Sequence, residues 1–204
     1  MTATPIRMSA ADRRSQLIDV AIDLFSRKGF GGTTTKEIAT AAGVTEAIIF
    51  RHFATKQDLY KAILDARCSN PDAQAWFSEA QQFMDANDDE GLFRALITTV
   101  IRHQREDPRF ERLMLHAALE GNEIAIMHHN QFALPIGQKL IEYVEKRQQQ
   151  GAIRQVDPKA VIFAVAGIAN YYAHHKYLCQ SANIPISDEA VTEAFLSIIM
   201  KGLK

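Results

Sequence analysis

The chain is poor in the residues that define several classes of protein. It has only two cysteines among 204 residues, Cys68 and Cys179, too few and too far apart for a disulfide framework or a zinc site. It has only ten glycines and six prolines, whereas 47% of its residues are hydrophobic. Such a chain can bury a substantial core, and its cysteine content is typical of a reducing compartment.

Long apolar runs are also lacking. The longest, Ala160–Ala173, is interrupted by Asn170 and is shorter than the roughly 18 residues that a membrane span needs. Met1–Ala11 has no apolar centre of the kind found in secretory signals. We therefore expect a soluble, cytoplasmic protein.

Catalytic and metal-binding motifs are missing as well. No phosphate-binding loop, nucleophile elbow or H-E-x-x-H pattern occurs. The paired histidines His128-His129 and His174-His175 would point about 100° apart on a helix, so neither pair forms a chelate. We expect no enzyme, no cofactor and no metal. A helical enzyme or carrier stays open as an alternative, but it would need a catalytic constellation that the sequence does not show.

Net charge is close to zero, but it is distributed unevenly. Residues 1–67 contain ten Lys or Arg and seven Asp or Glu, a net charge of +3. Because the whole chain has a net charge of −1, residues 68–204 have a net charge of −4. A basic end on an acidic body is a mild indication of nucleic-acid binding.

The most informative segment is Thr33–Phe53, which predicts two short helices joined by a tight turn. Thr34 and Glu37 form a capping-box pattern, Gly43 suits a left-handed turn residue, and Thr45 is placed to cap the second helix. A helix-turn-helix places such a second helix in the DNA major groove. The alternative is an αα-hairpin that merely packs within a helical protein.

The flanking segments favour the helix-turn-helix. An amphipathic helix over residues 13–30 is stopped by Gly29, and Thr55 can cap a further helix over Ala54–Leu64. Across residues 13–64 the chain resembles the TetR family of bacterial transcriptional regulators. The resemblance is carried by Lys28-Gly29-Phe30, Thr33-Thr34, Glu37-Ile38-Ala39, Ala42-Gly43-Val44-Thr45, Phe50, His52-Phe53, Lys56 and Asp58-Leu59.

The resemblance implies an all-α protein in three parts: a flexible tail (residues 1–9), a helix-turn-helix DNA-binding domain (10–54), and a connecting helix with a ligand-binding and dimerisation domain (55–204). It implies a ligand-responsive regulator, most often a repressor that a small molecule releases from its operator. The alternative is a TetR-like interaction or ligand-carrier protein that does not bind an operator. The effector itself cannot be named from the sequence.

The resemblance also implies which residues meet DNA. The phosphate-facing positions are Thr34, Thr35, Phe50, His52 and Lys56. The positions that could read base edges are Lys36, Thr45, Glu46, Ala47 and Arg51.

Three of these positions depart from the family pattern. Phe50 stands where a tyrosine is usual and cannot donate a hydroxyl, and Ala47 replaces a glycine. Glu46 repels phosphate but could accept a hydrogen bond from cytosine N4.

The remainder predicts further helices without strand periodicity, with a kink or break at Pro135 and a final helix capped by Ser187. Ala160–Ala173 is apolar nearly all round, so one side calls for a cover other than its own domain. A homodimer is the expected cover, and a central helix enclosed by its own neighbours is the alternative. The resemblance implies dimerisation through the last two helices, and the expected interface residues are Ile168, Tyr172, Phe195 and Ile199.

Overall fold

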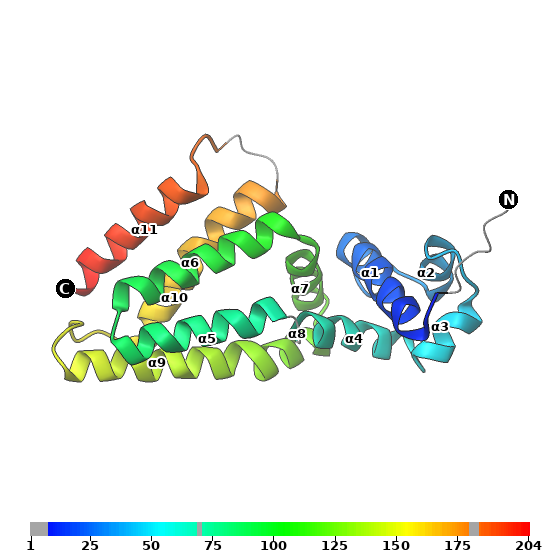
Figure 1. The fold of residues 1–204 in the computed structure, drawn as a ribbon. Helices are drawn as coiled ribbons and strands as arrows, with labels where there is room; N and C mark the ends of the chain where they lie inside the picture. The colour runs from blue at the N-terminus through cyan, green and yellow to red at the C-terminus, as the bar shows by residue number, and fades with distance from the viewer. Residues whose placement is uncertain (1–7, 69–70, 180–183) are drawn as a thin grey trace, which may run out of the picture. The chain divides into compact units, whose positions relative to one another are not determined.

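The computed structural model describes residues 8–68, 71–179 and 184–204, and over this part of the chain the protein is all-helical, as predicted (Figure 1). The elements are α1 (Ala10–Lys28), α2 (Thr35–Ala41), α3 (Glu46–His52), α4 (Lys56–Cys68), α5 (Pro71–Ala86), α6 (Asp89–Glu106), α7 (Arg109–Leu119), α8 (Glu123–His128), η1 (His129–Ala133), α9 (Leu134–Gln149), α10 (Pro158–Ala173), η2 (His174–Leu178) and α11 (Asp188–Leu203). Most of the predicted tail, residues 1–9, lies outside the described residues.

The described helices form two compact units. The first, called the head unit, contains the described residues up to Cys68 together with Arg109–Met127. The second, called the body unit, contains the described residues of the ranges 71–108 and 128–204. The head unit is therefore larger than the three helices predicted over residues 10–54, because both α4 and α7 pack against α1. The functional boundary at residue 54 stays a prediction.

Local signals in the sequence fix the helix ends of the head unit. Gly29 ends α1 with a φ of 70°, and Gly43 makes the turn after α2 with a φ of 66°, a conformation that costs glycine nothing. The predicted capping box is confirmed: Thr34 Oγ1 accepts from the Glu37 N–H, while Glu37 accepts from the Thr34 N–H. Thr45 is the N-cap residue of α3, as predicted, but its side chain makes no capping hydrogen bond.

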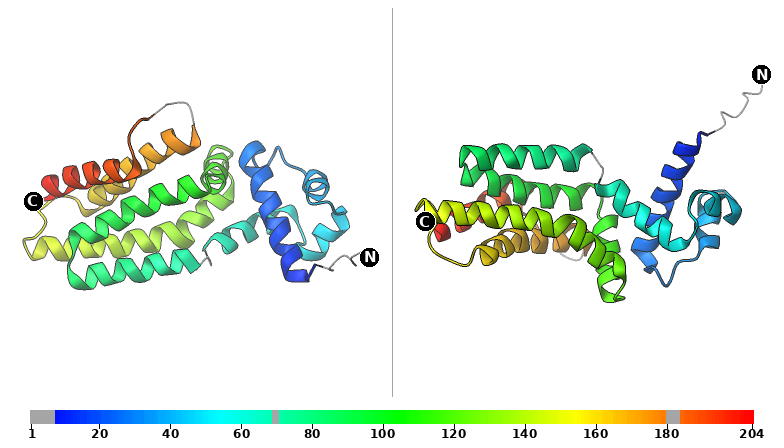
Figure 2. Two further views of the ribbon diagram at one scale, coloured as in Figure 1. Left: turned by 45° about the horizontal axis from the view of Figure 1, so that its top comes forward. Right: turned by 90° about the horizontal axis from the view of Figure 1, so that it is seen from below.

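The body unit is built around α6, which packs against α5, α10 and α11, while α10 also packs against α9 (Figure 2). Its core joins residues of all these helices, with Leu92, Phe93 and Ile97 of α6 fully buried. No helix among the described residues is both long enough and apolar enough to cross a membrane.

Pro135 has the predicted effect on its helix. The chain runs as α8, passes through one π-helical turn, and continues as α9 with Pro135 in its first turn. Proline lacks the N–H that an α-helix would direct to the residue four before it. The π-helical turn lies directly before Pro135, where the Leu134 N–H bonds to the carbonyl of His129, five residues back rather than four.

Candidate nucleic-acid interface

The turn at Gly43 fixes how α3 presents its outer face. Ile49 and Phe53 are buried in the head core, and the guanidinium carbon of Arg14 lies 5.0 Å from the centre of the Phe53 ring. The opposite side of α3 is open: Ala47 and Arg51 are exposed, and Phe50 is 48% exposed. An exposed aromatic ring beside an arginine on a short helix is a surface available to a partner rather than part of a core.

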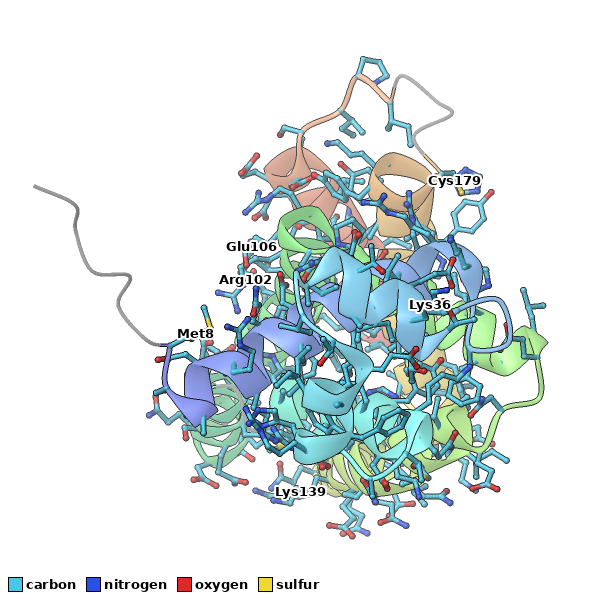
Figure 3. The ribbon with its side chains drawn as sticks, turned by 90° about the vertical axis from the view of Figure 1, so that its right-hand side faces the viewer. Met8, Lys36, Arg102, Glu106, Lys139 and Cys179 are labelled. Carbon is cyan, nitrogen blue, oxygen red and sulfur yellow. The ribbon has the colours of Figure 1, made fainter. Side chains whose placement is uncertain are left out.

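Helix α2 packs against α3, and both its N-cap Thr34 and Lys36 in its first turn are exposed. Figure 3 labels Lys36. The Thr34 hydroxyl donates its single proton to Glu37 over 2.9 Å. Hydrogen bonds from Lys28 and Thr34 lower the pKa of Glu37 to about 2, so this carboxylate stays ionised at neutral pH. The predicted phosphate contact of Thr34 would therefore have to exchange a bond to a carboxylate for one to phosphate.

A second hydroxyl is committed in the same way. Thr35 Oγ1 donates to Glu46 Oε2 over 2.7 Å, joining the first residue of α2 to the first residue of α3. Both side chains are half-buried. The bond fixes the orientation of Glu46 and occupies one of its two oxygens. No local pattern in the sequence marks this pair, which is eleven residues apart across the turn.

His52 and Lys56, the two remaining residues predicted to contact phosphate, direct their polar atoms into the head unit. His52 is half-buried, and its Nε2 is enclosed without a hydrogen-bond partner among the described residues. The ammonium of Lys56 donates to the carbonyls of Phe30 and Thr33 over 2.7 and 2.8 Å. Burial lowers the pKa of Lys56, and the charge of Glu120 opposes this shift. The phosphate contacts of both residues stay predictions.

The four residues predicted at a dimer interface face the core of the body unit. Tyr172 and Ile199 are buried there, and Ile168 and Phe195 are partly buried against them. Tyr172 is held inward by its hydroxyl, which donates to Asp188 Oδ1 over 2.9 Å. Their role at an interface stays a prediction, because a core residue can still support one.

Other apolar side chains of the last helices are open to solvent. Phe163 is 77% exposed, Tyr171 70% and Ile198 66%, and a Cβ added to Gly167 would meet no atom within 4 Å. Residues 163, 167 and 171 are spaced by four and therefore share one face of α10. We call Phe163, Gly167, Tyr171 and Ile198 the exposed apolar face.

A polar cluster that the sequence does not predict anchors the start of α11. Tyr177 and Lys176 donate to Asp188 over 2.6 and 3.0 Å, and Arg105 of α6 pairs with it over 3.1 Å. Burial alone would raise the pKa of Asp188, but the hydrogen bonds from Tyr177 and Lys176 lower it. Burial and the neighbouring carboxylate raise the pKa of Tyr177 to about 12. The cluster fixes η2, which continues α10, against α6 and α11.

The body unit also contains a pocket that could hold a small molecule. It has a volume of about 390 Å³ and lies between α5 and α9. Its walls are mainly apolar and include Trp76, Phe77, Met84, Ile136 and Leu140. The polar lining residues are Ser78, Gln81 and Lys139. This size falls in the range of small-molecule sites. Among the described residues, no group of three His, Cys, Asp or Glu side chains could hold a metal ion.

These observations define a class of protein. A short helix with an exposed outer face follows a tight glycine turn and a capped helix, and all three stand on a core shared with α1 and α4. This is the geometry of a helix-turn-helix DNA-binding protein, here with a separate helical unit that contains an apolar pocket.

The chain belongs to the TetR family of bacterial regulatory proteins. Residues 17–63 match the family "Bacterial regulatory proteins, tetR family", and residues 90–201 match "Tetracyclin repressor-like, C-terminal domain". The uncharacterized HTH-type transcriptional regulator YvkB of Bacillus subtilis (strain 168) is 25% identical over 191 residues, which cover 92% of this chain and 95% of YvkB. The HTH-type transcriptional regulator TtgR of Pseudomonas putida is 34% identical over 120 residues, 59% of this chain and 51% of TtgR.

Solved structures support the fold. The fatty acid degradation regulator FadR from Bacillus halodurans superposes with a TM-score of 0.70 at 16% identity, covering 100% of this chain and 99% of FadR. AibR, in complex with isovaleryl coenzyme A and operator DNA, superposes with a TM-score of 0.65 at 20% identity, covering 94% of this chain and 100% of AibR. The protein is thus a helix-turn-helix transcriptional regulator and not an enzyme, as the sequence predicted.

Proposed function

We propose that the protein is a homodimeric repressor that binds operator DNA through α2 and α3 and is released by a small molecule bound in the body unit. The observation that carries the DNA-binding part is the outer face of α3, where Arg51, Ala47 and Phe50 are exposed beside Lys36 of α2. Arg51 and Lys36 supply positive charge at the surface that meets the duplex, and contacts with phosphates position a protein while contacts with bases specify its site. Thr45 is also exposed at the start of α3 and can reach a base edge.

Selection of bound DNA from a random pool tests the DNA-binding part, and Glu46 provides its sharpest variant. We expect the wild type to select one palindromic site, and Glu46→Ala to lose preference at one base position of each half-site. A direct base contact contributes about 1–3 kcal/mol of discrimination, whereas non-specific affinity should stay equal or rise because a repelling carboxylate is removed.

Thr35→Val should weaken the preference at the same base position, because it removes the hydrogen bond that orients the Glu46 carboxylate. Thr35→Ser keeps the hydroxyl and should preserve the selected site. An unchanged site in Glu46→Ala would show that the carboxylate does not read DNA. A wild type that selects no site would favour the alternative of an interaction protein.

Homodimerisation supplies the second head that a palindromic site requires. The exposed apolar face on α10 and α11 supports it, since a monomer would leave Phe163 and Tyr171 in water. Such a face is self-complementary when two copies meet about a two-fold axis.

The proposed effector has an apolar group that fits between α5 and α9 and an anionic group that meets Lys139. The apolar walls and Lys139, the one charged residue among those that line the pocket, support this chemistry. The complex of AibR with isovaleryl coenzyme A, an acyl thioester with anionic groups, is in keeping with it.

The single tryptophan of the chain makes this proposal measurable, because Trp76 lines the pocket. We expect its fluorescence to change on titration with fatty acids or acyl-coenzyme A esters, and the same ligands to release the selected DNA. Lys139→Ala should weaken the binding of anionic ligands about tenfold, the effect of losing one charged hydrogen bond. Lys146→Ala, an exposed lysine on the same helix outside the pocket lining, is the matched control. Equal binding by both variants would contradict the role of Lys139.

A further inference from the structure

Two charged side chains from different helices hold the turn between α1 and α2. From α4, the ammonium of Lys56 donates to the carbonyls of Phe30 and Thr33 over 2.7 and 2.8 Å and lies 4.0 Å from the centre of the Phe30 ring. From the end of α7, Glu120 Oε2 accepts from the N–H of Phe30 over 3.2 Å. The peptide groups on both sides of Phe30 are therefore bound by ionised groups of opposite sign.

The turn is shaped to admit the carboxylate. Gly29 has a φ of +70°, and a Cβ at this position would lie 1.9 Å from Glu120 Oε1. A side chain at residue 29 would therefore be strained by this φ, and its Cβ would displace the Glu120 carboxylate from its present position. The Phe30 ring packs against Tyr60 of α4, with ring centres 5.0 Å apart. Contacts from α4 and α7 thus converge on the same few residues.

The position of this turn sets the position of α2. Thr33 is fully buried and donates its hydroxyl proton to the carbonyl of Gly29 over 2.9 Å. Thr34 follows directly as the N-cap of α2, and Thr35 then bonds to Glu46 of α3. A displacement of Phe30 or Thr33 would therefore be passed to the proposed DNA-contacting residues of both helices.

We propose that Lys56 and Glu120 form a clamp that positions the helix-turn-helix, and that Lys56 supports DNA binding through this turn rather than by contacting phosphate. The inference rests on the proposed operator binding. Two of the three N–H donors of the ammonium are committed to carbonyls within the head unit. A lysine that met phosphate would instead direct its charge outward, as the exposed Lys36 can.

The dependence of DNA affinity on salt separates the two roles. Each phosphate contact that is lost lowers the slope of log affinity against log salt by about 0.9. Lys56→Met and Lys36→Met each remove one lysine charge, so they are a matched pair. We expect Lys36→Met to flatten the slope, and Lys56→Met to weaken binding to the selected site about tenfold at every salt concentration with the wild-type slope.

Hydrogen exchange gives a readout that does not depend on DNA. Exchange of the backbone amides of residues 30–37 should be faster in Lys56→Met and unchanged in Lys36→Met. Glu120→Ala removes the bond to the Phe30 N–H and the charge beside Lys56. It should also speed this exchange without flattening the salt slope, and it serves as the test if Lys56→Met does not fold.

Two results would overturn the clamp. One is a slope that flattens in Lys56→Met as much as in Lys36→Met, with exchange of residues 30–37 unchanged. The other is wild-type exchange and affinity in both Lys56→Met and Glu120→Ala. If the wild type selects no DNA, the proposed function fails, but the exchange rates still decide whether the clamp exists.

Discussion

Phe163→Glu is expected to convert the dimer into monomers and to abolish binding to the operator. Phe163 lies on the exposed apolar face with Gly167, Tyr171 and Ile198, which the proposed dimer would bury. Each copy would then bury a carboxylate without a partner, at a cost of about 3 kcal/mol, and two-fold symmetry doubles this to about 6 kcal/mol. Such a loss weakens dimerisation by about four orders of magnitude. Sedimentation of wild type and variant, together with titration of the selected DNA, measures both effects.

Leu119→Glu is the matched control for this experiment. Leu119 is 86% exposed but lies on α7 of the head unit, whereas the exposed apolar face belongs to the body unit. The same change of an exposed apolar residue to glutamate should there leave the dimer intact. A Phe163→Glu protein that stays folded and dimeric, or a monomer that still binds the operator tightly, would disprove the proposed assembly.

Asp89→Ala should cause the largest loss of stability in the body unit. The carboxylate of Asp89 accepts from the Tyr143 hydroxyl over 2.6 Å and from Arg147 Nε and Nη2 over 2.7 and 3.0 Å. The Arg147 and Asp89 side chains are only 16% and 11% exposed. Removing the acceptor leaves the Tyr143 phenol without this partner and the largely buried guanidinium with only its bond to Gln150. The cost is about 3–5 kcal/mol, a large share of the roughly 5–15 kcal/mol typical of a whole domain.

Urea denaturation measures this loss, and an exposed ion pair supplies the comparison. Asp23 and Arg27 pair over 2.7 Å on α1 with side chains 34% and 65% exposed. Asp23→Ala should lower the free energy of unfolding by no more than about 0.5 kcal/mol, because solvent screens such pairs. Equal effects of the two substitutions would show that burial does not strengthen the Asp89 site.

The helix-turn-helix could be predicted because its signals are local. The capping box joins Thr34 to Glu37, and the turn depends on the left-handed conformation of the single residue Gly43. The cap at Ser187 is equally local, and it is confirmed by a hydrogen bond from the backbone N–H of Ala190, three residues later. Patterns of this kind are complete within one helical turn, so the sequence displays them directly.

The parts that could not be predicted depend on residues far apart in the chain. The partners of Lys56 lie 23 and 26 residues away, and the pocket joins α5 to α9. The orientation of α10 was equally hidden, because a helix that is apolar nearly all round has no periodicity to mark its inner side. The sequence therefore could not show that Tyr172 faces the core, where it bonds to Asp188, whereas Phe163 and Tyr171 of the same helix are exposed.

The presence of α7 in the head unit has a consequence for how the chain is made. Leu113, Ala117 and Ile124 are fully buried in the same core as Leu17 and Phe25 of α1. A fragment ending at Cys68 would therefore expose apolar residues of α1 to water, and a ribosome would have to release about 60 further residues before that core could close. Isolated N-terminal fragments are expected to aggregate or remain partly unfolded. A chimeric protein with a folded head unit must therefore contain both the residues up to Cys68 and Arg109–Met127.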